Sequence, residues 1–311
     1  MTRPAKSQST DSNPTASKPT ALSESDADAL IIKTQRQLAA GTFDATDEWL
    51  LVQLVEGFND KRGMKRFAFA EILDQVGKPA TPALIEGLAN HENPAVRRAC
   101  AKTITLIADR RTIPTLVHSL LHDEDTVVQG SVVGALAVMG EEAALVLIDI
   151  IGSSDYPDSA KGLATWGLSF VGVAGKTHLY ESLNAEKEEV RSAVVGALTS
   201  LVQEESDEQA LTAILRALKD DSAMVRSEAA AALGKLSDAT VIPQLASVLS
   251  DADSDVRKTA AMAMMKIGDG SAIAPIQAAL KQETDPAIQP VFKLAISQLE
   301  KKQEEEDDGW D

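Results

Sequence analysis

The most regularly spaced polar residues in this 311-residue chain are acidic and basic residues six positions apart. The clearest pairs are Asp220 with Arg226 and Asp251 with Arg257, and Asp155 with Lys161 is a variant. Carboxylates perform acid–base catalysis when two of them share one desolvated cleft, and evenly spaced pairs do not converge in this way. We therefore predict that the pairs are structural and form a ladder of ion pairs along the fold.

Cysteine and histidine offer little further chemistry. Cys100 is the one cysteine, which excludes an internal disulfide framework and indicates a reducing compartment, so we predict a cytoplasmic protein. His118 and His122 are four residues apart but have no third ligand of the expected type nearby, so we predict no metal site. The chain also has no glycine-rich phosphate loop after a strand and no nucleophile elbow, so self-contained catalysis is unsupported.

Composition narrows the fold and the partners. The chain is 44% apolar but only 4% aromatic, which favours stacked small helices over a β-sandwich or barrel. A net charge of −17 repels phosphate backbones, so we expect no nucleic acid partner. The longest apolar stretch, residues 143–151, is interrupted by Asp149 and is much shorter than the roughly 20 residues that cross a bilayer. We therefore predict no membrane insertion.

A repeat of about 32 residues fills the middle of the chain. The strings VRRACAKTI, VRSAVVGAL, VRSEAAAAL and VRKTAAMAM begin with a β-branched residue and arginine and continue with small residues. With weaker copies included, we place eight anchors at Met64, Val96, Val128, Ala160, Val190, Val225, Val256 and Ile288. Such regular spacing identifies one structural unit per copy.

Each unit carries the signals of two helices. A first helix should start near a proline that lies 13 or 14 residues before the anchor, at Pro82, Pro114, Pro243 and Pro275. A second helix should start at a capping residue three before the anchor: Asn93, Asp125, Ser222, Asp253 or Asp285. Glycines twelve residues after the anchor, Gly140, Gly172 and Gly268, should end the second helix in a left-handed conformation.

Helix pairs with one apolar side each must stack on their neighbours. We therefore predict an all-α, right-handed α-solenoid of about eight helix pairs over residues 47–300, preceded by a capping helix and linker in residues 25–46. Residues 1–24 are rich in Ser and Thr and are predicted to be a disordered tail, although Arg3 and Lys6 also suggest a transit peptide. Residues 301–311 are predicted to be an acidic tail in which Trp310 is either solvated or a docking residue.

The pattern of proline, turn aspartate, Val-Arg and a small-residue helix resembles HEAT repeats. The alanine-rich form, as in LSDADSDVRKTAAMAMMKIGD, is similar to the phycobilisome-lyase type of HEAT-like repeat. The string DEWLLVQLVEGFNDKRG and the acidic GWD end resemble cyanobacterial proteins of this group, including an IscA-interacting HEAT-repeat protein. This resemblance covers roughly residues 47–300 and implies the solenoid fold.

The central units depart from the repeat pattern. Near Asp123 the expected arginine is replaced by Gln129, and before Arg191 the expected acid is replaced by Ala185, so the ladder should weaken there. The same units place glycine or tryptophan two or six residues after the anchor, where other units have large side chains: Gly130, Gly134, Gly162, Trp166 and Gly196. Each helical glycine costs roughly 1 kcal/mol relative to alanine.

We predict that these residues form the floor of a groove on the concave side of the solenoid. Its basic wall would consist of Arg98, Lys102, Lys161 and Arg191. A planar ligand with carboxylates, or an acidic peptide, would suit this groove. Alternatively, the glycines only let neighbouring second helices approach closely, and Trp166 fills the gap.

Two functions remain open. The first is a non-catalytic protein-binding scaffold, because helical repeats present extended surfaces. The resemblance implies that its partners would be phycobiliproteins or an IscA-type iron–sulfur protein. The second, which the repeat family's name implies, is a subunit of a phycobilin lyase that attaches or detaches bilin on phycobiliproteins. We expect no cofactor, but the propionates and rings of a bound bilin would match the basic wall and Trp166.

Overall fold

The computed structural model describes residues 21–308, and in that range it contains seventeen α-helices and no strand. After α1 (Glu24–Ala39) the helices form eight pairs. The first helices are α2 (Glu48–Glu56), α4 (Thr81–Asn90), α6 (Ile113–His122), α8 (Glu141–Gly152), α10 (Lys176–Glu181), α12 (Glu208–Ala217), α14 (Ile242–Ser247) and α16 (Ile273–Leu280). The second helices are α3 (Gly63–Val76), α5 (Pro94–Ile107), α7 (Thr126–Ala137), α9 (Asp158–Leu168), α11 (Glu188–Glu205), α13 (Ala223–Leu236), α15 (Ser254–Ile267) and α17 (Gln289–Asp308). The predicted all-α solenoid is confirmed.

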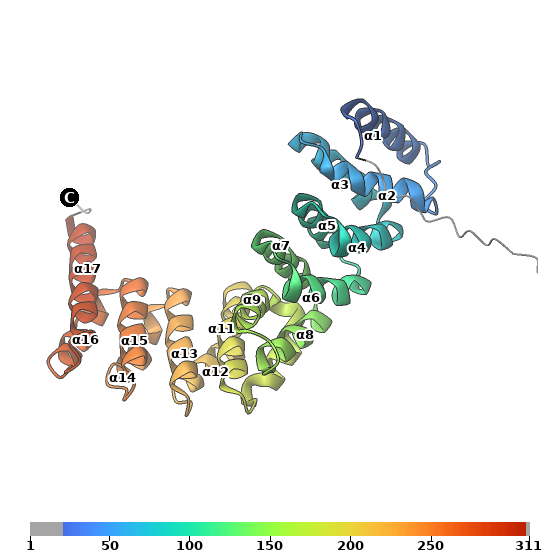
Figure 1. The fold of residues 1–311 in the computed structure, drawn as a ribbon. Helices are drawn as coiled ribbons and strands as arrows, with labels where there is room; N and C mark the ends of the chain where they lie inside the picture. Colours follow the sequence, from blue (N-terminus) through green and yellow to red (C-terminus); the bar gives the residue numbers. More distant parts are fainter. Residues whose placement is uncertain (1–20, 309–311) are drawn as a thin grey trace, which may run out of the picture.

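The helix pairs stack into an open arc (Figure 1). The second helices line the concave side and contact one another in sequence, α5 with α7, α11 with α13 and α13 with α15. The first helices line the outer side. Because each repeat contacts mainly its neighbours, one continuous core of buried Leu, Val, Ile and Ala side chains runs along the arc.

The repeat register follows from burial. Seven predicted anchors are buried, from Val96 in α5 to Ile288 just before α17. The anchor that we predicted at Met64 is wrong, because this side chain is 76% exposed. Arg66 donates to the carbonyl oxygen six residues before it, as Arg97 does in the next repeat. The first anchor is therefore Lys65, one residue later than predicted.

Of the three predicted helix ends, only Gly268 is confirmed, as the cap of α15; the predictions for Gly140 and Gly172 are wrong, because α7 already ends at Ala137 and α9 at Leu168. Gly140, Gly172 and Gly268 have φ values of +77°, +53° and +76°. Ala108 and Ser237 occupy the same position in their repeats and adopt φ values of 50° and 54° without being glycine. The left-handed residue is therefore a property of the repeat, and glycine is only its commonest occupant here.

Side chains cap three of the second helices, α5, α7 and α15, at their start. The predicted caps that accept a backbone N–H are Asn93, Asp125, Asp253 and Asp285. The prediction that the side chain of Ser222 caps α13 is wrong, because this side chain makes no capping hydrogen bond. Its backbone N–H instead donates to the side chain of Asp220. The first helices α4, α6 and α14 begin at the predicted prolines, Pro82, Pro114 and Pro243.

A ladder of ion pairs joins neighbouring repeats. Arg226 donates two hydrogen bonds to Asp251 of the next repeat, at 2.7 and 2.8 Å, and also donates to the backbone carbonyl of Asp220. The same arrangement joins Arg97 to Asp123, Arg191 to Asp220 and Arg257 to Glu283. The partners are therefore about 25 to 29 residues apart, and the six-residue pairs seen in the sequence belong to successive rungs.

The gaps in the ladder differ from the prediction. Asp123 and Arg191, which we predicted to lack partners, both belong to rungs. Two gaps lie on either side of α9, and a third lies between the first two repeats, where Arg66 bonds only backbone carbonyls among the described residues and His91 stands at the position of the acid. Gln129 donates to the backbone of Leu120 instead of bonding Asp155, and the repeat after Lys161 has alanine where the acid would stand.

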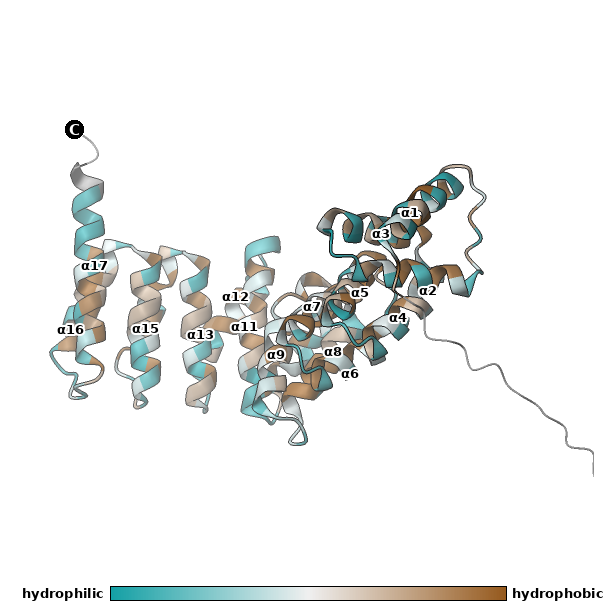
Figure 2. Cartoon of the chain, turned by 45° about the horizontal axis from the view of Figure 1, so that its top comes forward, coloured by the Kyte–Doolittle hydropathy of each residue, from teal (hydrophilic) through white to brown (hydrophobic). Residues whose placement is uncertain are grey.

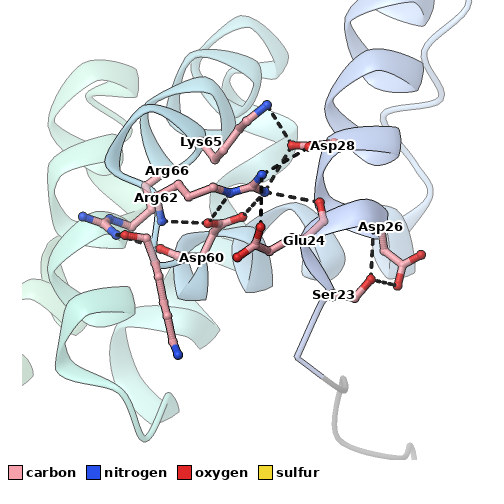
Figure 3. Close-up of polar contacts among 9 residues, drawn as sticks. Ser23, Glu24, Asp26, Asp28, Asp60, Arg62, Lys65 and Arg66 are labelled. Carbon is pink, nitrogen blue, oxygen red and sulfur yellow. Dashed lines mark hydrogen bonds and ion pairs between the residues drawn. The ribbon is translucent and has the colours of Figure 1, made fainter.

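The N-terminal end of the arc is covered by α1, which packs on α3 through Ala27 and Ile31. Figure 3 shows Arg62 between Asp28 of α1 and Asp60, with Lys65 also reaching Asp28 at 2.7 Å. These contacts bind the covering helix to the first repeat. Residues 1–20, most of the predicted N-terminal tail, lie outside the described residues.

At the C-terminal end the structure differs from the predicted tail boundary. We predicted an acidic tail from residue 301, whereas α17 continues to Asp308. Figure 2 shows that the end of α17 is hydrophilic and projects beyond the preceding pairs. Lys302 donates to the carbonyl of Gly268 at 2.9 Å, which holds the extension to α15. Trp310 lies outside the described residues.

Candidate functional site

An aromatic pair lies on the concave row of helices. Trp166 of α9 is 48% exposed, and Phe170, which follows α9, is 57% exposed. Their rings meet edge to face with centroids 5.4 Å apart. A Cβ atom added to Gly130 of α7 would lie 3.9 Å from the indole ring of Trp166. We call Gly130, Gly134, Gly162, Trp166 and Phe170 the glycine–tryptophan surface.

Two glycines of this surface face open space. A Cβ atom at Gly134 or Gly162 would have no atom within 4 Å apart from its own helix and chain neighbours. The alternative that these glycines permit close helix approach is therefore wrong for both positions. Close approach occurs elsewhere, at Gly234, where an added Cβ would lie 2.8 Å from Ala263.

Gly196 of α11 does not extend the open floor that we predicted. Glu228 of α13 lies against it, and a Cβ at position 196 would come within 2.6 Å of a carboxylate oxygen. Burial raises the pKa of Glu228, while Lys235, 3.5 Å away, opposes that effect. Gly196 therefore makes room for a carboxyl group at the edge of the glycine–tryptophan surface.

Only two of the four residues predicted for the basic wall, Arg98 and Lys102, lie exposed together. Arg98 and Lys102 are exposed on α5, which packs against α7, at the same repeat positions as Gly130 and Gly134. Arg191 does not join them, because its guanidinium belongs to the ion-pair ladder with Asp220. Lys161 occupies the corresponding ladder position of α9 and is half-buried.

A row of exposed apolar side chains was not predicted. Leu106, Val138 and Phe170 each lie ten residues after an anchor and are 59%, 49% and 57% exposed. The equivalent positions in the two following repeats are Ser200 and Lys235. Comparing this one position across repeats would have revealed the row in the sequence.

The described residues offer no accessible sulfur nucleophile. Cys100 is fully buried, and burial raises the pKa of its thiol. His118 and His122 stack with ring centroids 4.7 Å apart. Within residues 21–305, no three His, Cys, Asp or Glu side chains gather as a metal site would require.

Two cavities lie away from this surface. One, of 370 Å³, is lined by α2 and α4 and includes the hydrogen-bonded pair of Glu56 and His91. Another, of 740 Å³, is lined by residues of α10, α11 and α12. No helix in the described part of the chain is long and apolar enough to cross a membrane.

Comparisons with known proteins agree with this architecture. The family of HEAT repeats matches residues 81–169, 176–247 and 211–296. Bilin biosynthesis protein MpeU of Synechococcus sp. (strain WH8020) is 34% identical over 217 residues, which are 70% of this chain and 73% of MpeU. A deoxyhypusine hydroxylase of Chaetomium globosum is 33% identical over 88 residues, 28% of this chain and 26% of that enzyme.

Among solved structures, the complex of CpcE and CpcF of phycocyanin lyase from Nostoc sp. PCC7120 has a TM-score of 0.43 and 19% identity. The match covers 50% of this chain and 98% of the other. The HEAT-repeat match extends over more than half of the chain, and the match to MpeU extends over most of both proteins. This chain is therefore a HEAT-repeat protein and belongs to the family of bilin biosynthesis protein MpeU.

Proposed function

We propose that this protein holds a bilin on the glycine–tryptophan surface and presents it to a phycobiliprotein for attachment or removal. The relationship to MpeU supports a bilin as the ligand. The observation that carries the proposal is the half-exposed Trp166, whose ring lies over Gly130 and beside the open backbone of Gly162. A planar tetrapyrrole can stack on such a ring without meeting side chains from the flanking helices.

The neighbouring cations, Arg98 and Lys102, are suited to pair with the propionates of a bilin. Arg98 and Lys102 stand on α5, two helices from Trp166. At about 8–10 Å between neighbouring helix axes, the span from these cations to the indole is roughly 16–20 Å. The rings of a bilin would therefore lie over α7 and α9 while its propionates pair with the cations.

The protein's part in the reaction would be to position the reactants. The acceptor's thiol adds across the ethylidene double bond of the bilin, which forms one C–S bond and leaves the thiol proton on carbon. This addition needs no oxidant and no nucleophile from the HEAT-repeat protein, whose Cys100 is buried. Holding the bilin in one orientation is the contribution that such a surface makes.

The row of Leu106, Val138 and Phe170 favours a second candidate function, binding of a protein without bilin. An exposed apolar row of this kind is typical of a protein interface. A phycobiliprotein would fit either function, and an IscA-type partner stays a prediction.

Visible absorption during titration with phycocyanobilin tests the proposal. We expect a saturable spectral shift that Trp166→Ala weakens at least tenfold. Trp49→Ala is the matched control, since Trp49 is 53% exposed but stands on α2, in the outer row. No shift, or equal loss in both variants, would reject the bilin and leave the protein-binding scaffold.

A further inference from the structure

A cavity opens between repeats five and six, on the outer side of the arc. It has a volume of 740 Å³ and is lined by Tyr180 of α10, by η5 (Ser182–Asn184), by α11 and by one face of α12. Pockets of roughly 300–1,000 Å³ are the usual size for small organic ligands. Its volume therefore suits a small molecule.

The repeat that contributes α11 to the cavity has an extra turn of helix. In the other repeats the left-handed residue follows the anchor by twelve positions, as in Gly140 and Gly268, but after Val190 it is Ser206, sixteen positions later. Four more residues lengthen α11 by about 6 Å. The helices α10 and α12 pack on each other less than α2 and α4 do, as is also true of α6 with α8 and of α14 with α16.

The lining combines an apolar floor with three cations, Arg191, Arg216 and Lys219, and two carboxylates, Asp220 and Asp221. Val195 and Ala217 are buried at the floor, and Arg216 and Lys219 lie three residues apart at the rim. Neither cation makes a hydrogen bond or ion pair with the described part of the chain. By contrast, Arg191, which also lines the cavity, is neutralised by Asp220.

Arg216 lies in the last turn of α12, and Lys219 lies in the turn that follows, where its backbone N–H donates to the carbonyl oxygen of Arg216 at 3.0 Å. Two carboxylates joined by a short apolar body would reach both cations, and the guanidinium of Arg216 is suited to bidentate carboxylate binding. A single inorganic anion would leave the apolar floor uncovered. An uncharged apolar ligand would leave Arg216 and Lys219 without a partner.

We propose that this cavity binds a small organic dicarboxylate with an apolar body. The site is separate from the glycine–tryptophan surface and does not rest on the proposed function. Aliphatic diacids and bilins, which carry two propionates, share this chemistry, so the experiment includes one probe of each kind.

Calorimetric titration of the full-length protein with suberate is the direct test, with octane-1,8-diol as the neutral probe of the same length. We expect suberate to bind and the diol not to bind. Arg216→Gln/Lys219→Gln should lower the affinity for suberate at least tenfold. The matched charge change Arg98→Gln/Lys102→Gln should leave this affinity unchanged. Absence of suberate binding, or equal loss in both double variants, would overturn the proposal.

A filling variant provides an independent check. Ala213 lines the cavity and is half-buried, so Ala213→Trp should block suberate without unfolding the protein. Unchanged suberate binding in this variant, at an unchanged melting temperature, would contradict the proposed location.

Phycocyanobilin, the second probe, separates this inference from the proposed function. If Arg216→Gln/Lys219→Gln abolishes its binding and Trp166→Ala does not, the cavity is the bilin site, and the proposal for the concave surface fails. If only Trp166→Ala abolishes it while suberate still requires Arg216, both proposals stand.

Discussion

The carboxylate of Asp220 accepts two hydrogen bonds from the guanidinium of Arg191, at 3.0 and 2.8 Å, although the two residues belong to different repeats. The N–H groups of Arg191 that do not face Asp220 donate to carbonyls of their own turn. Each such arginine therefore connects the turn before its helix to the turn of the next repeat. The rungs are part of the interface energy that makes a solenoid cooperative.

Removal of one carboxylate from a rung should destabilise the protein. In Asp251→Asn, the partly buried guanidinium of Arg226 loses its charged partner, which we expect to lower the free energy of unfolding by about 2–3 kcal/mol. Asp155→Asn is the matched control, since Asp155 occupies the same repeat position but is exposed. Urea denaturation monitored by circular dichroism measures both variants, and equal losses would refute the role of the rung.

At residues with positive φ, introducing glycine and removing glycine should change the stability of the protein in opposite directions. Ser237→Gly removes a side chain from a residue with φ of 54° and should stabilise the protein by about 0.5–1 kcal/mol. Gly140→Ala introduces a side chain at φ of +77° and ψ of −144°, a backbone conformation that is almost exclusive to glycine, and should cost about 1–3 kcal/mol. Thermal denaturation would contradict this account if both substitutions shifted the melting temperature in the same direction.

The open glycines should tolerate larger residues. Gly134→Ala and Gly162→Ala add a methyl group where no atom lies within 4 Å, so we expect each to raise the free energy of unfolding by about 1 kcal/mol. Gly234→Ala is the control, because its Cβ would clash with Ala263. If Gly134→Leu is stable but no longer binds phycocyanobilin, this glycine serves binding rather than folding. If the variant binds phycocyanobilin with undiminished affinity, Gly134 is not part of the site.

Asp207 is expected to make the protein sensitive to acid. Its side chain pairs with Lys176, caps α12 and accepts from Tyr180, and the bond with Lys176 is the main reason why its pKa falls from 3.8 to about 2. A lowered pKa contributes stability above the unfolded value, and this contribution is lost as pH falls from about 5 toward 2. Asp207→Ala should therefore show a weaker acid dependence and lose about 2–3 kcal/mol at pH 7.

Denaturation of Asp207→Ala at pH 7 and pH 3 measures this dependence. Tyr180→Phe removes only one neutral donor to Asp207 and should cost about 1 kcal/mol or less at pH 7. An acid dependence in Asp207→Ala as steep as in the natural protein would show that other carboxylates determine it.

Cys100 should be inert in the folded protein. Its side chain is fully buried, and a Cβ atom added to Gly87 would lie only 2.7 Å from its sulfur. Labelling by a thiol reagent should therefore occur at the rate of unfolding and accelerate in urea. Fast labelling in the absence of denaturant would restore Cys100 as a candidate nucleophile.

The repeat made most of the fold predictable from sequence. Helix starts, helix ends and the buried anchors depend on local residue types, so Asn93 and Gly268 identified their positions directly. The ladder was harder to assign, because its partners are remote in sequence and Asp220 is closer along the chain to Arg226 than to Arg191. The extra turn at the end of α11, which places the left-handed residue at Ser206, appears in the repeat interval only as three extra residues.

The candidate site was predictable in part. The open positions of Gly134 and Gly162 and the exposure of Trp166 follow from their place in the repeat. The loss of Gly196 from the floor does not, because a side chain from a neighbouring helix, Glu228, occupies the space. Register alone does not reveal where long side chains from other repeats extend.

The missing rungs on either side of α9 determine the mechanics of the whole arc. An elastic rod bends where its cross-links are fewest, and α9 also contacts α7 and α11 less extensively than α13 contacts α11 and α15. A load applied at the two ends of the molecule is therefore concentrated at the repeat that carries Trp166. Any partner that grips both arms of the arc would change the curvature around this indole first, so its fluorescence would report the strain.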